Sequence, residues 1–124
     1  MGGPSSAIER EGVGETEEKG SRMEKKVQSH LSQKLMKRRM ELDLVNEKLL
    51  TLLNRRLRIA LEIGKVKGEM GKKIYDPGRE KEILDRLRRK NKGPLREEDL
   101  RKIFVTIIKV CRQSQIQIGR KSES

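Results

Sequence analysis

The feature that most constrains the fold is a stretch of 36 residues, Leu35 to Met70, that contains no proline and repeats its apolar residues at heptad-like spacing. The repeat has two interleaved series of positions, which are Leu35, Leu42, Leu49, Arg56, Ile63 and Met70 and then Arg38, Val45, Leu52, Ile59 and Val66. An apolar stripe of this period predicts one long helix. Such a helix would be about 54 Å long, whereas a compact domain of about 90 residues has a radius of gyration of about 12 Å. Since its own domain cannot cover a stripe of this length, we expect an intertwined helical homodimer.

Turn-forming residues divide the rest of the folded region into two further helices. Gly71 ends the long helix, and Asp76-Pro77 has the pattern of an N-cap followed by proline in the first turn. The second helix is predicted to run to about Asn91, where the sequence NKGP breaks it, and the acidic residues at 97–99 suit the start of a third. The predicted inward residues are Ile83, Leu84 and Leu87 on the second helix and Leu100, Ile103, Phe104, Ile107, Cys111 and Ile118 on the third. The predicted fold class is all-α, with three helices in the order long, short, long.

The composition divides the chain into an N-terminal extension, a folded domain and a short tail. Residues 1–22 are rich in Gly, Ser and Glu and have almost no apolar side chains, so they cannot bury enough surface to offset the entropy of ordering. We expect residues 1–34 to be a disordered or partly helical extension, in which residues 23–34 either stay disordered or lengthen the first helix. Residues 35–118 form the predicted folded domain, and residues 119–124 are expected to be a flexible tail.

The net charge of +12 is concentrated in the predicted helical region. Residues 1–34 are neutral overall, whereas residues 35–118 have 23 basic and 12 acidic residues. This excess fits either a helical surface that binds phosphates or a pocket for a small anion. The apolar runs are too short to span a membrane, the N-terminus has no apolar block of the signal-peptide type, and a single cysteine excludes an internal disulfide. We therefore expect a cytoplasmic protein.

Several long polar side chains occupy inward positions on the predicted helices. Arg56 takes a core heptad position, and Lys67, eleven residues later, lies only about 20° further round the helix. Arg79 and Glu80 precede the inward residues of the second helix by one turn, and Gln115 continues the stripe of the third. Such side chains can extend to the surface or pair with one another, as Arg79 could with Glu80. Because they occur on all three helices and are mostly cationic, we favour a pocket for an anion that has carboxylates or phosphates.

Groups that commonly perform covalent or metal chemistry are scarce in this sequence. His30 is the single histidine and falls in the extension, and Cys111, on an apolar stripe, is interpreted as a small buried apolar residue rather than a nucleophile. No cluster has metal-ligand spacing, and no glycine-rich phosphate loop is present. If the chain is an enzyme, we expect it to act by positioning and electrostatics, without a metal or a cofactor.

Four segments of the sequence resemble the all-helical chorismate mutases, including those fused to prephenate dehydratase or dehydrogenase. These segments are ELDLVNEKLLTLLNRRLRIALEIGKVK, KIYDPGREKEIL, NKGPL and IFVTIIKVCRQSQ. The resemblance extends from Met36 to Gln115, and the order and spacing of the segments make it specific. It implies that residues 35–118 are a chorismate mutase domain, which converts chorismate to prephenate by a Claisen rearrangement in phenylalanine and tyrosine biosynthesis.

The resemblance also implies roles for individual residues. Lys67 and Gln115 match the pair that contacts the ether oxygen of the substrate, and they are the predicted catalytic residues. Arg56 matches the arginine that pairs with a substrate carboxylate. Arg39 matches an arginine that reaches into the active site of the partner subunit. Seventeen residues of helix, about 25 Å, separate Arg39 from Arg56, which agrees with supply of Arg39 in trans.

The rest of the predicted site lies at the start of the second helix and on the third. Asp76, Arg79 and Glu80 match the loop and helix that hold the substrate hydroxyl. Cys111 departs from the family pattern, because relatives commonly have Ser or another small residue there and a thiol is a weak hydrogen-bond donor. The full set of predicted substrate-binding residues is Arg39, Arg56, Lys67, Asp76, Arg79, Glu80, Cys111 and Gln115.

The predicted partners are the small-molecule substrate chorismate and a second copy of the chain, with neither a nucleic acid nor a membrane. Because some family members are fused to other enzymes, we also predict association with another enzyme of the shikimate pathway. Two alternatives remain open. A basic helical dimer that binds nucleic acid would explain the charge of the helical region, but not the inward Arg56, Lys67 and Gln115, and aromatic residues for stacking are lacking. A non-catalytic regulatory homologue would keep the fold, but the complete residue set argues against it.

Overall fold

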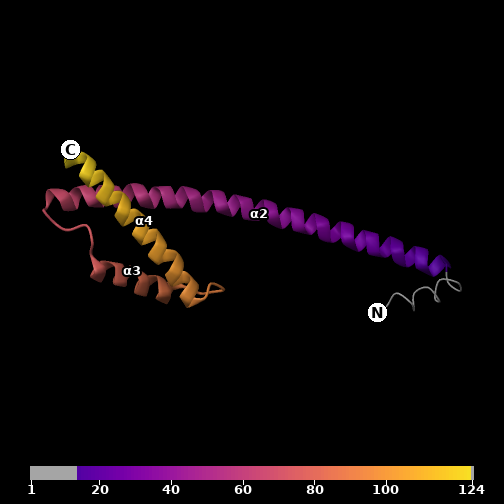
Figure 1. Cartoon of the computed structure of the whole chain (residues 1–124). Coiled ribbons are helices and arrows are strands. Elements are labelled where there is room, and N and C mark those ends of the chain that lie inside the picture. Colours follow the sequence, from indigo (N-terminus) through magenta and orange to yellow (C-terminus); the bar gives the residue numbers. More distant parts are fainter. Residues whose placement is uncertain (1–13, 124) are drawn as a thin grey trace, which may run out of the picture. The chain divides into compact units, whose positions relative to one another are not determined.

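The structure is a computed structural model that describes residues 14–123 (Figure 1). This part of the chain contains three helices, α2 (Gly14–Glu69), α3 (Pro77–Lys90) and α4 (Glu97–Glu123), and no strand. The predicted all-α class and the order long, short, long are therefore confirmed. The chain divides between Leu49 and Leu50 into two compact units. No described helix is long and apolar enough to cross a membrane.

The two ends of the described chain are more helical than the sequence led us to expect. Helix α2 begins at Gly14, so residues 23–34 are helical, and so are residues 14–22, for which we expected disorder. No proline interrupts the chain between Pro4 and Pro77, and a helix that is already nucleated extends at little cost. Helix α4 likewise continues through residues 119–123 of the expected flexible tail. Residues 1–13 and 124 lie outside the described residues.

In the unit that precedes Leu50, α2 presents a continuous row of apolar side chains to solvent. All described side chains from residue 21 to residue 49 are exposed. The large apolar residues among them, each about half exposed or more, are Met23, Val27, Leu31, Leu35, Met36, Met40, Leu42, Leu44, Val45 and Leu49. An apolar surface of this length is typical of an interaction face. The heptad stripe predicted from the sequence is thus uncovered in the single chain.

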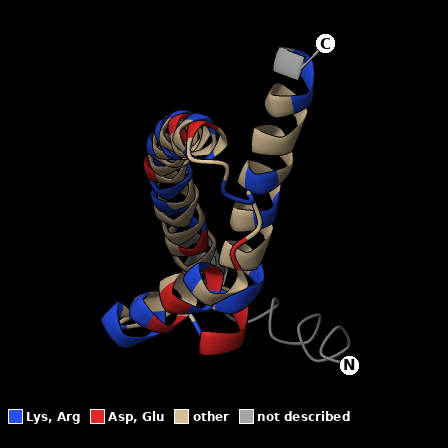
Figure 2. Cartoon of the chain, turned by 90° about the vertical axis from the view of Figure 1, so that its left-hand side faces the viewer, with Lys and Arg blue, Asp and Glu red and all other residues tan. Residues whose placement is uncertain are grey.

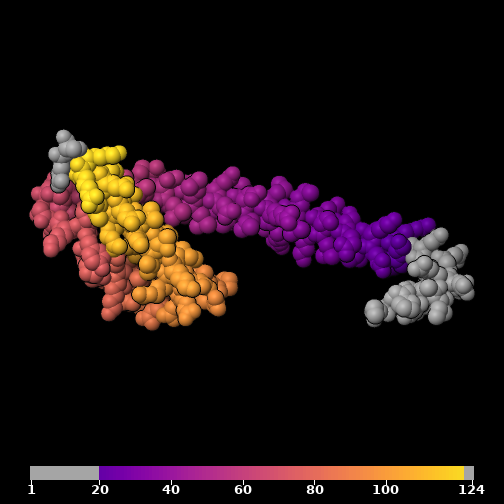
Figure 3. Space-filling view, in the orientation of Figure 1, coloured from indigo at the N-terminus to yellow at the C-terminus, as the bar shows by residue number. Residues whose placement is uncertain are grey.

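In the unit that starts at Leu50, α3 and α4 pack together and α4 crosses the end of α2 (Figures 1 and 3). The buried residues of this unit are Ala60, Leu100, Ile108 and Cys111. The burial of Leu100 and Cys111 agrees with the stripe predicted for the third helix. Ile103 and Ile118 of that stripe are instead 47% and 48% exposed, and Ile108, which lies outside the predicted stripe, is buried. Five residues of helix place Ile103 about 140° round from Ile108, so Ile103 faces away from the packed side.

Local sequence signals fix where the helices end. After Glu69 the chain turns at Gly71, which has a φ of +68°, and the N–H of Lys72 donates to the carbonyl of Lys67 at 2.8 Å. This is the glycine-dependent helix stop that the sequence predicted. Pro77 opens α3, and the Asp76 carboxylate accepts a hydrogen bond from the Arg79 backbone N–H at 3.0 Å. The predicted N-cap is confirmed, and it anchors the loop from residue 71 to residue 76.

Lys and Arg are distributed over all three helices rather than gathered in a terminal tail (Figure 2). The charge therefore lies on the folded part of the chain, as the sequence indicated. The last turn of α3 contributes Arg88, Arg89 and Lys90, where cations are favoured by the negative end of the helix dipole.

Candidate active site

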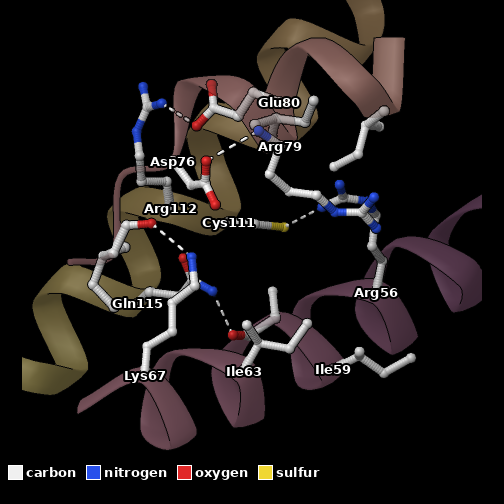
Figure 4. A pocket seen from close by; sticks show the side chains of 14 residues that line it. Arg56, Ile59, Ile63, Lys67, Asp76, Arg79, Glu80, Cys111, Arg112 and Gln115 are labelled. Atoms are coloured by element: carbon white, nitrogen blue, oxygen red, sulfur yellow. Dashed lines mark hydrogen bonds and ion pairs between the residues drawn. The ribbon is translucent and has the colours of Figure 1, made fainter. Parts of the chain in front are cut away.

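A cavity of about 470 Å³ lies in the unit that starts at Leu50, between the end of α2, the start of α3 and the middle of α4. Seven of the eight residues predicted from the sequence line it: Arg56, Lys67, Asp76, Arg79, Glu80, Cys111 and Gln115 (Figure 4). Arg39, the eighth, belongs to the other unit, is exposed and does not line the cavity. The fold therefore gathers residues that are up to 59 positions apart in the sequence.

Helix α2 provides one wall of the cavity, with a cation at each end. Arg56 and Lys67 are both partly buried, and the apolar residues Ile59, Ala60 and Ile63 lie between them. Their eleven-residue spacing is three turns of helix, so both side chains project to the same side. The sequence interpretation that these two cations share a face is confirmed.

The guanidinium of Arg56 is held by Cys111. Its Nη1 nitrogen donates to the Cys111 Sγ at 3.2 Å, and Cys111 is 7% exposed. The thiol was interpreted as a small buried residue, and the structure confirms its burial. Sulfur is a weak acceptor, so this contact orients the guanidinium and leaves its other N–H groups available for further contacts.

Lys67 and Gln115 point into the same part of the cavity and are each fixed by a backbone carbonyl (Figure 4). The Lys67 ammonium donates to the carbonyl of Ile74 at 3.1 Å, and the Gln115 Nε2 donates to the carbonyl of Ala60 at 2.5 Å. An ammonium has three N–H donors and a side-chain amide has two. Each group therefore keeps at least one donor for a ligand after its backbone contact is made.

The position of the Gln115 side chain also depends on a close approach of α4 to α2 at Gly64. A Cβ atom added to Gly64 would lie 3.1 Å from the Gln115 Cγ and 3.2 Å from its Cβ. Any larger residue at this position would require the Gln115 side chain to shift by a few tenths of an ångström.

The start of α3 brings Asp76, Arg79 and Glu80 to the cavity, each with a different partner. Asp76 caps the helix through the Arg79 backbone N–H, and the Arg79 guanidinium pairs with Glu82 at 3.2 Å on the exposed side. Glu80 pairs with a residue of α4 instead. The suggestion that Arg79 pairs with Glu80 is therefore wrong, since adjacent helical residues point about 100° apart.

That partner is Arg112, a functional candidate which the sequence reasoning missed. Its Nη1 nitrogen lies 2.5 Å from the Glu80 Oε2, and its guanidinium carbon lies 4.6 Å from the centroid of the Tyr75 ring. Arg112 lines the cavity with Gln115, which follows it by three residues on α4. This helical spacing from a predicted site residue was the available signal.

Among the described residues there is no group of three or more His, Cys, Asp and Glu side chains that could hold a metal ion. The charged and amide side chains that line the cavity are four cations, two carboxylates and one glutamine amide.

Residues 38–116 match the family model of "Chorismate mutase type II". The chain belongs to this family. The match spans all three helices and all seven predicted residues that line the cavity. Arg39 also falls within it, whereas the N-terminal extension, residues 1–34, lies outside.

Two solved structures of the chorismate mutase from Thermus thermophilus are similar to this chain. Form II has a TM-score of 0.65 at 39% identity, over 66% of this chain and 93% of that one. Form I has a TM-score of 0.62 at 41% identity, over 63% of this chain and 98% of that one. The shared part is the family region, so the fold and the family membership agree.

Similar curated proteins are larger and combine two activities in their names. The bifunctional chorismate mutase/prephenate dehydratase of Aquifex aeolicus is 36% identical over 83 residues, which is 64% of this chain and 23% of that protein. The protein of the same name from Neisseria gonorrhoeae is 35% identical over 77 residues, which is 62% of this chain and 21% of that protein. The matched chorismate mutase region thus spans about a fifth to a quarter of the length of these relatives.

Proposed function

We propose that this chain is a chorismate mutase, which converts chorismate to prephenate in the biosynthesis of phenylalanine and tyrosine. The observation that carries the proposal is the cavity that brings Arg56, Lys67 and Gln115 together in a chain of this family. The reaction is an intramolecular rearrangement in which one carbon–oxygen bond breaks and one carbon–carbon bond forms. It requires no nucleophile and no external proton transfer, so positioning and electrostatics are sufficient.

The charge of the cavity supports a substrate with two carboxylates. Among the described lining residues the cations outnumber the carboxylates by two, the cations being Arg56, Lys67, Arg79 and Arg112 and the carboxylates Asp76 and Glu80. A dianion balances this excess. Arginine suits the carboxylate contacts because its planar guanidinium can donate two parallel hydrogen bonds. In this mechanism Arg56 clamps one substrate carboxylate and favours the compact reactive conformer.

Lys67 and Gln115 act on the bond that breaks. Negative charge develops on the ether oxygen as it separates from carbon, and preorganised donors stabilise such charge most when water is excluded. The backbone contacts of both residues support this role, because they fix the donors before the substrate binds. Asp76 and Glu80 accept from the substrate hydroxyl, with Arg79 beside them on the same turn.

We further propose that the active form is a homodimer in which Arg39 acts in the site of the partner subunit. The exposed apolar row on α2 supports a second copy of the chain as its cover. Arg39 is 17 positions from Arg56 in sequence, which a helix converts to about 25 Å. The two arginines of one chain are then too far apart to hold one small molecule.

The proposal is tested with the purified 124-residue chain and chorismate. We expect chorismate absorbance to fall and prephenate to appear as the product. Arg56→Ala should abolish most of this activity, whereas Arg58→Ala, which removes an exposed arginine two residues away, should retain most of it. A folded wild-type protein that leaves chorismate unchanged would refute the function and favour the non-catalytic alternative.

A further inference from the structure

Arg112 and Glu80 form the least exposed ion pair among those described for this chain. Their side chains are 24% and 26% exposed, and the Nη1–Oε2 distance is 2.5 Å. The pair formed by Arg79 and Glu82 is far more exposed, at 59% and 70%. Partly buried charges are screened less by water and salt than exposed ones. The Arg112–Glu80 contact is therefore a fixed element of the cavity wall, which joins α4 to α3.

Arg112 also joins α4 to the loop that precedes α3. Its guanidinium lies over the ring of Tyr75, at 4.6 Å from the centroid, which is a cation–π distance. Tyr75 follows Ile74, whose carbonyl accepts the hydrogen bond from Lys67. A planar guanidinium can donate in its plane to a carboxylate and offer its face to a ring at the same time, whereas an ammonium has no such face.

The contact leaves one oxygen of Glu80 available for a ligand. Oε2 accepts from Arg112, and no hydrogen bond to Oε1 comes from the part of the chain that the structure describes. Glu80 lines the cavity, so an unpaired carboxylate there would repel a dianionic substrate. The Arg112 cation offsets this charge and fixes the direction of the second oxygen.

We infer that Arg112 is a positioning residue, which acts on the reaction through Glu80 by aiming its free oxygen at the substrate hydroxyl and neutralising its charge. This inference rests on the proposed chorismate mutase function and assigns to it a residue outside the predicted site. It requires that Arg112 has little effect once the Glu80 carboxylate is gone.

The first test compares single variants of the full chain in the chorismate assay. Arg112→Met, which keeps the bulk of the side chain, should lower kcat/KM roughly 10- to 100-fold, as expected for loss of a charge-assisted hydrogen bond. Arg112→Lys keeps the charge but not the stacking, so its loss should be smaller. Lys109→Met removes one exposed cation from the same helix and should retain wild-type activity.

The deciding test is a double-mutant cycle with Glu80→Gln. If Arg112 acts through Glu80, then Arg112→Met should change kcat/KM by less than about threefold in the Glu80→Gln background, because coupled residues are not additive. Equal fold losses in both backgrounds, or no loss in the wild-type background, would overturn the inference and leave the proposed function intact. If Arg112→Met does not fold, the cycle with Arg112→Lys makes the same distinction. A wild-type protein without mutase activity would overturn the function and this inference together.

Discussion

Gly64 is the position where the smallest possible substitution should test the placement of Gln115. In the Gly64→Ala variant the new methyl group would lie 3.1 Å and 3.2 Å from the Cγ and Cβ of Gln115. Ordinary van der Waals contacts of a Cβ atom are 3.4–4 Å long, so the neighbouring side chain must yield by a few tenths of an ångström. Its amide is held to the Ala60 carbonyl at 2.5 Å, and the displacement would strain that bond.

The expected effects on stability and on activity differ in size. Replacing glycine by alanine inside a helix stabilises by about 1 kcal/mol, whereas overpacking costs about 1–3 kcal/mol. The net loss of unfolding free energy should therefore be between about 0 and 2 kcal/mol. A misplacement of about 1 Å can cost roughly 100-fold in rate, so a few tenths of an ångström should lower kcat about 3- to 10-fold.

Two matched variants separate this steric effect from a general effect on α2. Gly68 lies one turn further along the same helix, and a Cβ atom added there would have no neighbour within 4 Å. Gly68→Ala should raise the melting temperature slightly and leave turnover unchanged. In a Gln115→Ala background, Gly64→Ala should cause little further loss of turnover, because the amide that the methyl group would displace is absent. Steady-state kinetics and thermal unfolding measure both effects. Wild-type kcat in Gly64→Ala, or an equal loss in the Gln115→Ala background, would refute the reasoning.

The remaining predictions concern the catalytic lysine and the dimer. Lys67→Ala should lower kcat by roughly 10²- to 10³-fold, the usual loss when one preorganised donor to developing charge is removed. Lys65→Ala should leave kcat nearly unchanged, because that side chain is exposed and lies outside the cavity. Equal losses of kcat in the two variants, measured by steady-state kinetics, would contradict the assignment. A mixture of Arg39→Ala and Arg56→Ala chains should regain activity through heterodimers in which one composite site has both arginines. No recovery, with subunit exchange verified by mass spectrometry, would contradict supply of Arg39 in trans.

The sequence predicted the features that depend on local spacing. Heptad spacing predicted the long helix, and Gly71 and Asp76-Pro77 predicted the turn between α2 and α3. Arg56 and Lys67 could be placed on one face because helical geometry converts an eleven-residue separation into an angle. These features require no knowledge of how the helices pack.

The contacts between helices could not be predicted in this way. The Arg112–Glu80 pair joins residues 32 positions apart, and the Gln115–Ala60 contact joins residues 55 positions apart. Both depend on the crossing of helices, which no helical period encodes. The helical state of residues 14–22 was also missed, because composition describes what a segment can bury and not whether a neighbouring helix extends into it.

The cavity and the uncovered apolar stripe share residues, which links binding to assembly. Ile59 and Ile63 line the cavity, and they also belong to the heptad series, where they are 50% and 48% exposed in the single chain. A partner that covers the stripe at these positions would also remove water from the wall between Arg56 and Lys67. Electrostatic stabilisation by preorganised groups becomes stronger as water is excluded. On the proposed dimer model, burial of the stripe therefore strengthens the electrostatic interaction between these cations and the substrate, in addition to stabilising the fold.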